Sequence, residues 1–453
     1  MTKKDQILAQ QQDEEELGYM QRESPALSMW YPSVIDCLRA IFGNPEDAKL
    51  MCWHASGDRT KDDGKLRHPS DGKQWKDFDA MFPEFGQEAR NVRFALSTDE
   101  MNPFGDFSSS HNTLPVILTI YNLPPSICQK RRYLLLTMLI SRPKQPGNDI
   151  DVFLEPLMDD MKKLWEGVEM MDASVQKKFT LKAIIFVTIA DYPGLFSLSG
   201  QIKGKTGYVV CIDGTCYTYL KGSNKIVYKS HKRFLVKKHR CRRDTMIKYF
   251  DNQPEPQLDE PKHTSYGKRV FTMVKDMNEA EFGKKKKDTE GTTRKRKRDN
   301  KEEPSVIVPF KKKPIFFKYL SYWKTLDTPH AIDCIHLEKT VFERTIGVLL
   351  DIKKKTKDGL KLWMDLVNLG IRDDHHPQPS TQNGKVDLPG AGYNLTTDER
   401  RAMCLWLRGV KVPTGFSSNI KSLVSIKDLT MTNYKSHDCH VMLMKAVGCA
   451  HLH

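Results

Sequence analysis

The feature that most constrains the fold is a segment at residues 92–99 that alternates two kinds of side chain and ends on an acid. Val92, Phe94 and Leu96 alternate with polar or smaller residues, which is the period of a half-buried β-strand. Asp99 follows directly, and Asn102-Pro103 then favours a turn. A carboxylate at a strand end can hold a metal ion, but aspartate is also an ordinary turn residue. The metal interpretation therefore depends on whether other carboxylates converge on Asp99.

Composition indicates a soluble globular protein with polar insertions. The chain has 453 residues, which is enough for two or three domains, with 39% hydrophobic and 28% charged residues. No run of 18 apolar residues is present, and the N-terminus lacks the apolar core of a signal peptide, so no membrane partner is expected. The ten cysteines are irregularly spaced, which favours reduced thiols in a cytosolic or nuclear protein.

The net charge of +15 is concentrated in two basic runs. The first, residues 229–243, has eight Lys/Arg and no acid, and its Phe234 and Leu235 favour an ordered segment. Concentrated positive charge of this kind is typical of phosphate contacts, so we expect a DNA-facing surface there, with a solvated linker as the alternative. The expected DNA-binding residues are Lys229, His231, Lys232, Arg233, Lys237, Lys238, Arg240, Arg242 and Arg243.

The second run, residues 284–298, has nine basic and two acidic residues and no apolar ones. A two-part nuclear localisation signal in a disordered loop suits this composition best, and nuclear localisation is expected. The signal would comprise Lys284, Lys285, Lys286, Lys287, Arg294, Lys295, Arg296, Lys297 and Arg298.

The apolar periodicity predicts how the chain is organised. Strands are expected at 92–97, 115–121, 133–140 and 182–190, and a helix from Leu154 to Val168 with Pro156 tolerated in its first turn. Further helices are expected at 335–352, at 358–370 and from Thr397. The predicted domains are a disordered polar arm (1–28), a helical N-terminal segment (29–90), the first part of the core with the basic His/Cys segment (91–250), a low-complexity basic insertion (251–310), the remainder of the core with a third acid (311–372) and a C-terminal helical and loop segment (373–453).

The order strand, strand, strand, helix, strand is the order that a ribonuclease H-like core uses. In that fold the first and fourth strands each bring an acid to the same edge of the sheet. Asp99 and Asp191 occupy those two places, and Asp191 directly follows the apolar run 182–190. The predicted fold class is therefore α/β, a ribonuclease H-like core of the DDE/D type with a helical insertion and flanking helical segments.

A third carboxylate is expected on the helix at 335–352. At 100° per residue, Glu338 lies roughly 100° from Leu337, inside a stripe that also includes Val341 and Val348, whereas Glu343 lies roughly 240° away. We therefore predict Glu338, with Asp333 and Glu343 as alternatives. Three hard oxygen ligands favour Mg²⁺ or Mn²⁺, and two such ions promote in-line displacement at phosphorus.

Several ordered stretches of the sequence resemble one family, the transposases of plant CACTA elements, also called Enhancer/Suppressor-mutator elements. They cover roughly residues 50–445 and are Leu66–Asp71 with Trp75–Phe78, Arg93–Phe104, Asp151–Pro156, Asp191–Pro193 with Leu198–Gly200, Tyr228 with His231–Leu235, Ile332–Lys339, and Gly409–Pro413 with Ser417–Ile420. The resemblance implies a DDE/D-type transposase with a ribonuclease H-like core, which cuts element ends and joins them to target DNA.

The sequence departs from the family pattern at two places. Glu100 stands where the family commonly has a turn glycine after the aspartate. The family also tends to carry a CxxC pair before the basic segment, whereas here Cys211 is preceded by Tyr208 at the paired position. Cys211, Cys216 and His231 leave an unusually spaced set for Zn²⁺, and free thiols with a DNA-facing histidine are the favoured alternative.

The expected function is thus a metal-dependent DNA transposase acting by two-metal phosphoryl transfer, with Asp99, Asp191 and Glu338 as the catalytic metal ligands. The alternative is a non-catalytic nuclear DNA-binding or interaction protein derived from a transposase. Family members are generally longer at both ends, so a truncated, inactive remnant is an expectation too. The expected partners are double-stranded DNA at element termini and target, a second copy of the chain and an accessory element protein.

Overall fold

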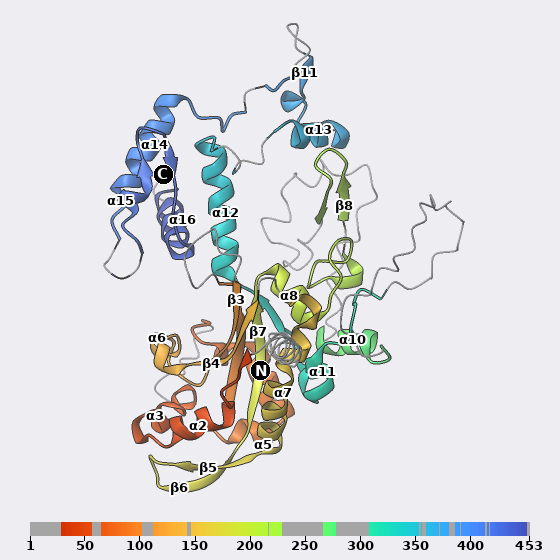
Figure 1. Cartoon of the computed structure of the whole chain (residues 1–453), viewed down its shortest axis with the longest axis vertical. Coiled ribbons are helices and arrows are strands. Elements are labelled where there is room, and N and C mark those ends of the chain that lie inside the picture. Colours follow the sequence, from red (N-terminus) through yellow and green to blue (C-terminus); the bar gives the residue numbers. More distant parts are fainter. Residues whose placement is uncertain are drawn as a thin grey trace, which may run out of the picture. The chain divides into compact units, whose positions relative to one another are not determined.

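The computed structural model describes residues 29–56, 65–101, 112–142, 146–215, 217–228, 266–277, 308–352, 355, 359–370, 372–379, 386–389, 391–412, 415 and 417–450 (Figure 1). The chain divides into two compact units, each described by itself. The first comprises Met1–Gly200, Ser265–Lys301 and Lys312–Ala331, and the second Gln201–Thr264, Glu302–Lys311 and Ile332–His453. The predicted polar arm and the predicted localisation signal lie outside the described residues.

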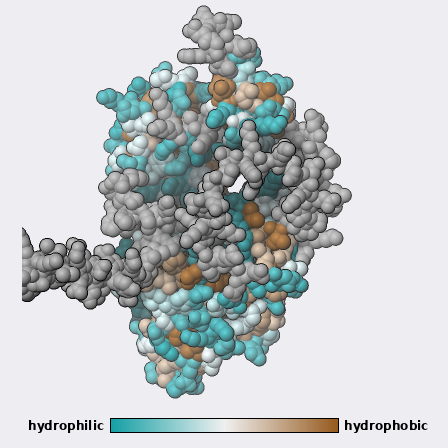
Figure 2. All heavy atoms as spheres, turned by 45° about the vertical axis from the view of Figure 1, so that its right-hand side comes forward, coloured by the Kyte–Doolittle hydropathy of each residue, from teal (hydrophilic) through white to brown (hydrophobic). Residues whose placement is uncertain are grey.

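On the face drawn in Figure 2, hydrophilic residues predominate and hydrophobic ones form separate patches. Within the described part of the chain, no helix has the length and apolar character needed to cross a membrane.

A six-stranded mixed sheet is the centre of the first unit, with strand order β1-β4-β3-β2-β7-β10. β2 pairs antiparallel with β3, β3 antiparallel with β4, and β2 parallel with β7. The strands are β1 (Met29–Trp30), β2 (Val92–Thr98), β3 (Asn112–Ile120), β4 (Leu134–Arg142), β7 (Ala183–Ala190) and β10 (His330–Ile332). The α/β class and the four predicted strands are therefore confirmed, with shifts of one to three residues at their ends.

Helices and one hairpin accompany this sheet. They are α2 (Val34–Phe42), α3 (Pro45–Leu50), α4 (Lys73–Met81), α5 (Pro83–Gln87), α6 (Pro125–Cys128), α7 (Ile150–Glu166), β5 (Val168–Asp172), β6 (Lys177–Leu181), α8 (Tyr192–Ser199), α10 (Tyr266–Val274) and α11 (Ile315–Tyr319). The β5–β6 hairpin was not predicted, since only Met170, Phe179 and Leu181 of its apolar residues are buried. The expectation that Pro156 lies in the first turn of α7 was wrong, because the helix begins at Ile150 and Pro156 is its seventh residue.

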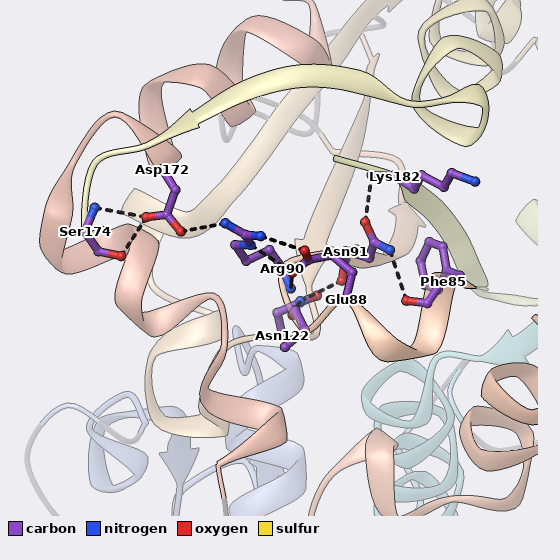
Figure 3. Close-up of polar contacts among 9 residues, drawn as sticks. Phe85, Glu88, Arg90, Asn91, Asn122, Asp172, Ser174 and Lys182 are labelled. Atoms are coloured by element: carbon purple, nitrogen blue, oxygen red, sulfur yellow. Dashed lines mark hydrogen bonds and ion pairs between the residues drawn. The ribbon is translucent and has the colours of Figure 1, made fainter. Parts of the chain in front are cut away.

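Two buried asparagines set the register at which β2 and β7 begin (Figure 3). The Asn91 carboxamide oxygen accepts from the Lys182 backbone N–H at 2.7 Å, and its nitrogen donates to the Phe85 carbonyl at 3.0 Å. Asn122 accepts from the Arg93 N–H at 3.0 Å and donates to the Asn91 carbonyl at 2.9 Å. Both side chains satisfy buried backbone groups that no strand partner reaches, so they fix where the parallel pairing starts.

Side chains also form hydrogen bonds with the backbone of a bulge in β7. The register shifts so that Phe94 opposes Ile185 and Ala95 opposes Val187, which leaves Phe186 unpaired. The Ile185 N–H donates to the buried Tyr322 hydroxyl at 2.9 Å, and Gln74 donates to the Phe186 carbonyl at 3.2 Å. The bulge is thereby fixed by two segments that are far from it in sequence.

A buried cation joins the N-terminal helices to the sheet. Arg93 is 1% exposed, its guanidinium lies 3.9 Å from the centre of the Trp75 ring and 4.8 Å from that of Phe85, and it pairs with Asp79. Burial lowers the pKa of Arg93 to about 10 and raises the pKa of Asp79, against the opposing effect of each partner. The stretch Trp75–Phe78, one of those that carry the resemblance, is therefore a packing element.

A second buried ion pair joins the segment after the charged insertion to α7. Lys312 Nζ donates to Asp151 Oδ1 at 2.7 Å, and the two side chains are 1% and 9% exposed. Lys312 also packs against Gly200, where a Cβ would lie 2.7 Å from the lysine Cγ and where φ is +69°. Burial raises the pKa of Asp151 from 3.8 to about 6 and lowers the pKa of Lys312. Because the folded pKa is the higher one, the stability that protonated Asp151 contributes is lost as the pH rises through about 6.

The second unit contains a helical core. Its elements are β8 (Tyr217–Leu220), β9 (Lys225–Tyr228), α12 (Cys334–Leu349), α13 (Leu360–Leu369), β11 (Gln378–Pro379), β12 (Val386–Asp387), α14 (Thr397–Gly409), α15 (Ile420–Leu423), β13 (Val424–Ser425), β14 (Thr430–Met431) and α16 (Ser436–Ala450). The predicted helices at 335–352, at 358–370 and from Thr397 are confirmed as α12, α13 and α14. Thr396 and Glu399 form a capping box at the start of α14.

The predicted buried face of α12 was wrong. Leu337 and Val341 are 49% and 48% exposed, whereas Phe342, Ile346 and Leu350 are buried in the core of the second unit. These three residues recur every four positions, so they lie on one face, roughly opposite Leu337. The prediction rested on the apolar residues near Leu337 and left out the stripe formed by Phe342, Ile346 and Leu350. Burial of the helix face therefore does not distinguish Glu338 from Glu343.

We expect Asn122→Ala to destabilise the protein by about 3 kcal/mol, because it leaves the buried Arg93 N–H and the Asn91 carbonyl without partners. Urea unfolding followed by circular dichroism measures this loss. The control Asn394→Ala removes an exposed side chain and should change stability by less than about 0.5 kcal/mol. Equal stability of the two variants would contradict the role assigned to Asn122.

Lys312→Met should cost about 3–5 kcal/mol, because it leaves the Asp151 carboxylate buried without its partner. Adding Asp151→Leu should recover most of this loss, since an apolar pair of similar volume replaces the ion pair. Thermal and urea unfolding of both variants give the coupling energy. Lys163→Met, which removes a 64% exposed lysine, is the matched control. A double variant less stable than Lys312→Met would contradict this account.

Candidate metal centre

Asp99 and Asp191 follow two parallel strands at the same edge of the sheet. Asp99 comes directly after β2 and Asp191 directly after β7, and these strands are neighbours with Ser97 opposite Ile189. Parallel strands end at the same edge, so the register alone places the two acids beside each other. The Asn91 contact at the other end of the pair fixes this register.

The two carboxylates lie within reach of one another. A carboxylate oxygen of Asp99 lies within 4.8 Å of one of Asp191. Asp99 is exposed and Asp191 partly buried. Each accepts a backbone N–H at 2.8 Å, from Glu100 and Gly194 respectively, which leaves further oxygen lone pairs on each carboxylate. Asp191 is also the N-cap of α8, so the helix orients its side chain.

A small pocket contains both acids. Its lining residues come from the ends of β2 and β7, the start of β3 and the first turns of α7 and α8: Thr98, Asp99, Glu100, Leu114, Pro146, Gly147, Ile150, Asp191, Gly194 and Ser197. About 20 Å³ is open to the centre of a water-sized sphere, which is room for one water molecule or one small ion inside the pocket, and the pocket is partly open to solvent.

The donor chemistry of this pocket fits a hard divalent cation. Oxygen ligands on opposite sides of Mg²⁺ are about 4 Å apart, so two carboxylate oxygens within 4.8 Å can share one ion with little movement. Between them the two aspartates offer only oxygen ligands, which favours Mg²⁺ or Mn²⁺ over Zn²⁺.

Glu100 and Gly194 lie next to the two aspartates and affect the charge and the space around them. The backbone of Glu100 does not adopt the left-handed conformation, so no glycine is needed at this position, and the residue adds a third carboxylate to the lining. Gly194 is required by contact: a Cβ there would lie 2.9 Å from the Ala190 Cβ and 3.1 Å from Asp191 Oδ1. Gly194 was not predicted as a site residue, although the stretch Asp191-Tyr-Pro-Gly194 is typical of a tight helix start.

The candidate third acids belong to the second unit. Glu338 Oε2 lies 2.6 Å from His440 Nδ1, a residue of α16, and its side chain is 33% exposed. Asp333 is the N-cap of α12 and accepts the Ile335 and His336 N–H groups. Glu343 lies near Tyr434 and Cys439, whose pKa values are raised chiefly by burial and further by its charge. Glu338 is thus the one of the three with a histidine partner, and Asp333 already caps a helix.

The other predicted sites lie mostly outside the described residues. Cys211 is buried, but Cys216 and His231 are not described, so the zinc hypothesis stays a prediction. The predicted DNA-binding residues from Lys229 to Arg243 are likewise not described.

We expect Gly194→Ala to weaken Mn²⁺ binding about 10- to 100-fold, because the new methyl group displaces the Asp191 carboxylate that the Gly194 N–H orients. Isothermal titration calorimetry measures the affinity. Gly392→Ala is the matched control, since a Cβ there meets nothing within 4 Å. Unchanged binding in Gly194→Ala, with the fold intact, would contradict the assignment of Asp191.

Comparisons with known proteins add an independent observation. Searches of curated proteins and of solved structures found no match. Residues 63–277 match a family model described as Transposase family tnp2, and this range includes Asp99 and Asp191. The match supports a transposase family for this chain.

Proposed function

We propose that the chain is a metal-dependent DNA transposase of the DDE/D type, resembling those of CACTA elements, with a ribonuclease H-like core. The observation that carries the proposal is the pairing of Asp99 and Asp191 at the end of two parallel strands, inside the range that matches the transposase family. The family match supports the transposase part, and the pair of carboxylates supports the metal-dependent part.

The topology of the sheet favours the ribonuclease H-like core. Three antiparallel strands, β2, β3 and β4, are followed by α7 and then by β7, which pairs parallel with the first of them. This is the order expected from the sequence for that core, with β1 added at one edge and the β5–β6 hairpin inserted before β7.

In this proposal Asp99 and Asp191 hold the divalent metal, and Glu338 is the third acid. A bound pair of Mg²⁺ or Mn²⁺ ions would activate the attacking hydroxyl and stabilise the leaving oxygen at phosphorus. The backbone N–H groups of Glu100 and Gly194 orient the two aspartates. His440 orients Glu338 through the hydrogen bond at 2.6 Å, as outer-shell partners of ligands commonly do.

The substrate proposed is double-stranded DNA at element ends and at the target. The basic run from Lys229 to Arg243 would contact the phosphate backbone, and the run from Lys284 to Arg298 would direct the chain to the nucleus. A second copy of the chain and an accessory element protein are proposed partners.

Cleavage of element-end DNA in Mg²⁺ should fall at least about 100-fold in Asp99→Asn and in Asp191→Asn, since each amide keeps the shape but removes a charged metal ligand. A gel assay of labelled duplexes measures strand cleavage and joining. Asp276→Asn, which changes an acid that is 88% exposed, is the control and should cleave as the native chain does.

The third acid is tested in the same assay. Glu338→Gln should lose activity to a similar extent, whereas Glu343→Gln should retain it. Activity that survives Asp191→Asn would overturn the proposed metal centre. A native chain that binds DNA but neither binds Mn²⁺ nor cleaves would instead support a non-catalytic DNA-binding protein.

A further inference from the structure

The β8–β9 hairpin of the second unit presents tyrosine rings on one face. Tyr217 is opposite Tyr228 and Tyr219 is opposite Ile226, so these four residues share one face of the two-stranded ribbon. Tyr217 and Tyr219 are 40% and 52% exposed. Aromatic rings are large apolar groups. Two rings that are this exposed, at neighbouring positions on one face, indicate a contact surface.

The turn of the hairpin is bound by a side chain of α13. The backbone N–H groups of Gly222 and Ser223 donate to the two carboxylate oxygens of Asp365, at 2.6 and 2.9 Å. Asp365 lies in α13 and is 1% exposed. A Cβ at Gly222 would lie 2.4 Å from the Lys361 carbonyl oxygen, so only glycine allows this approach. The turn is therefore fixed to α13 by a buried carboxylate.

Hydrogen bonds at the hydroxyl groups also orient two of the rings. Tyr219 donates to Asn224 Oδ1 at 3.0 Å, and Tyr228 donates to the Gly204 carbonyl at 2.9 Å. Their rings therefore lose little conformational entropy when a ligand binds.

One lysine lies beside these rings, and the sequence around them is basic. Lys205 Nζ lies 5.6 Å from the centre of the Tyr217 ring. Residues 201–228 contain four lysines (Lys203, Lys205, Lys221 and Lys225) and one acid, Asp213. The basic run with eight Lys/Arg begins at the very next residue, Lys229. An anionic ligand with flat apolar groups matches this combination of charge and ring surface.

We propose that this face of the hairpin, Tyr217, Tyr219 and Tyr228 with Lys205, is a stacking platform for unpaired bases of single-stranded DNA. The face of a base in a duplex is covered by its neighbours, so tyrosine rings gain stacking contacts only with unpaired nucleotides, while lysines contact the phosphates. The inference deepens the proposed function and rests on it for its biological meaning, because cutting and joining DNA ends exposes unpaired strands.

The test is fluorescence anisotropy of the full chain with a labelled oligo-dT of about 16 nucleotides, in EDTA. Tyr217→Leu/Tyr219→Leu should weaken binding about 10- to 100-fold, since leucine keeps the apolar bulk but cannot stack as a ring does. Tyr217→Phe/Tyr219→Phe should retain most of the affinity, because both rings remain and only the hydrogen bond from Tyr219 to Asn224 is lost. Trp30→Ala, at a 79% exposed aromatic of the first unit, should bind like the native chain.

An abasic oligonucleotide of the same length separates stacking from charge. The native chain should prefer the oligonucleotide with bases, and the leucine variant should lose this preference. A leucine variant that keeps it, or that binds both oligonucleotides more weakly by the same factor, overturns the proposal. So does a loss that is larger for duplex than for single-stranded DNA.

The matched phenylalanine variant and circular dichroism exclude misfolding as the cause of a loss. The experiment is also separate from the metal centre, because EDTA removes divalent ions. Failure of cleavage with intact stacking would overturn only the metal-dependent activity, and the reverse result would overturn only the stacking platform.

Discussion

The parallel pairing of β2 with β7 is the constraint on which the candidate metal centre depends. Without this pairing, Asp99 and Asp191 are two turn residues 92 positions apart in sequence. With it, Ser97 lies opposite Ile189 and the two acids follow at one edge of the sheet. A shift of two residues in the register would separate the carboxylates by about 7 Å along the strands, beyond the reach of a shared ion.

The protein fixes this register at the end of the sheet opposite the acids. Asn91, directly before β2, binds the backbone of Lys182, directly before β7. Asn122 satisfies the backbone beside Asn91, and Arg93 packs between Trp75 and Phe85. The bulge at Phe186 is bound by Gln74 and, through Ile185, by Tyr322. Residues that never approach the pocket thus determine whether its two carboxylates meet, which gives a physical reason why packing motifs accompany the candidate pair of metal ligands.

Buried charges have a second role in the first unit. Lys312 pairs with Asp151 in the first turn of α7 and packs against Gly200 at the end of α8. The first turns of these two helices contribute Ile150 and Gly194 to the pocket. The segment that follows the charged insertion is therefore joined to the two helices that line the pocket, through an ion pair whose loss leaves a buried charge unpaired.

The sequence by itself determined four strands of the central sheet, the longer helices α7, α12, α13 and α14, and the two aspartates as candidates, because apolar periodicity and strand ends are local properties of the chain. It could not determine the buried face of α12, since Phe342, Ile346 and Leu350 are selected by the other helices of that core and not by Leu337 and Val341. Nor could it find the Lys312–Asp151 pair, the Asn91 and Asn122 contacts, or the anchoring of the β8–β9 turn by Asp365. Each of these joins residues distant in sequence, and only the tertiary structure brings such groups within hydrogen-bonding distance.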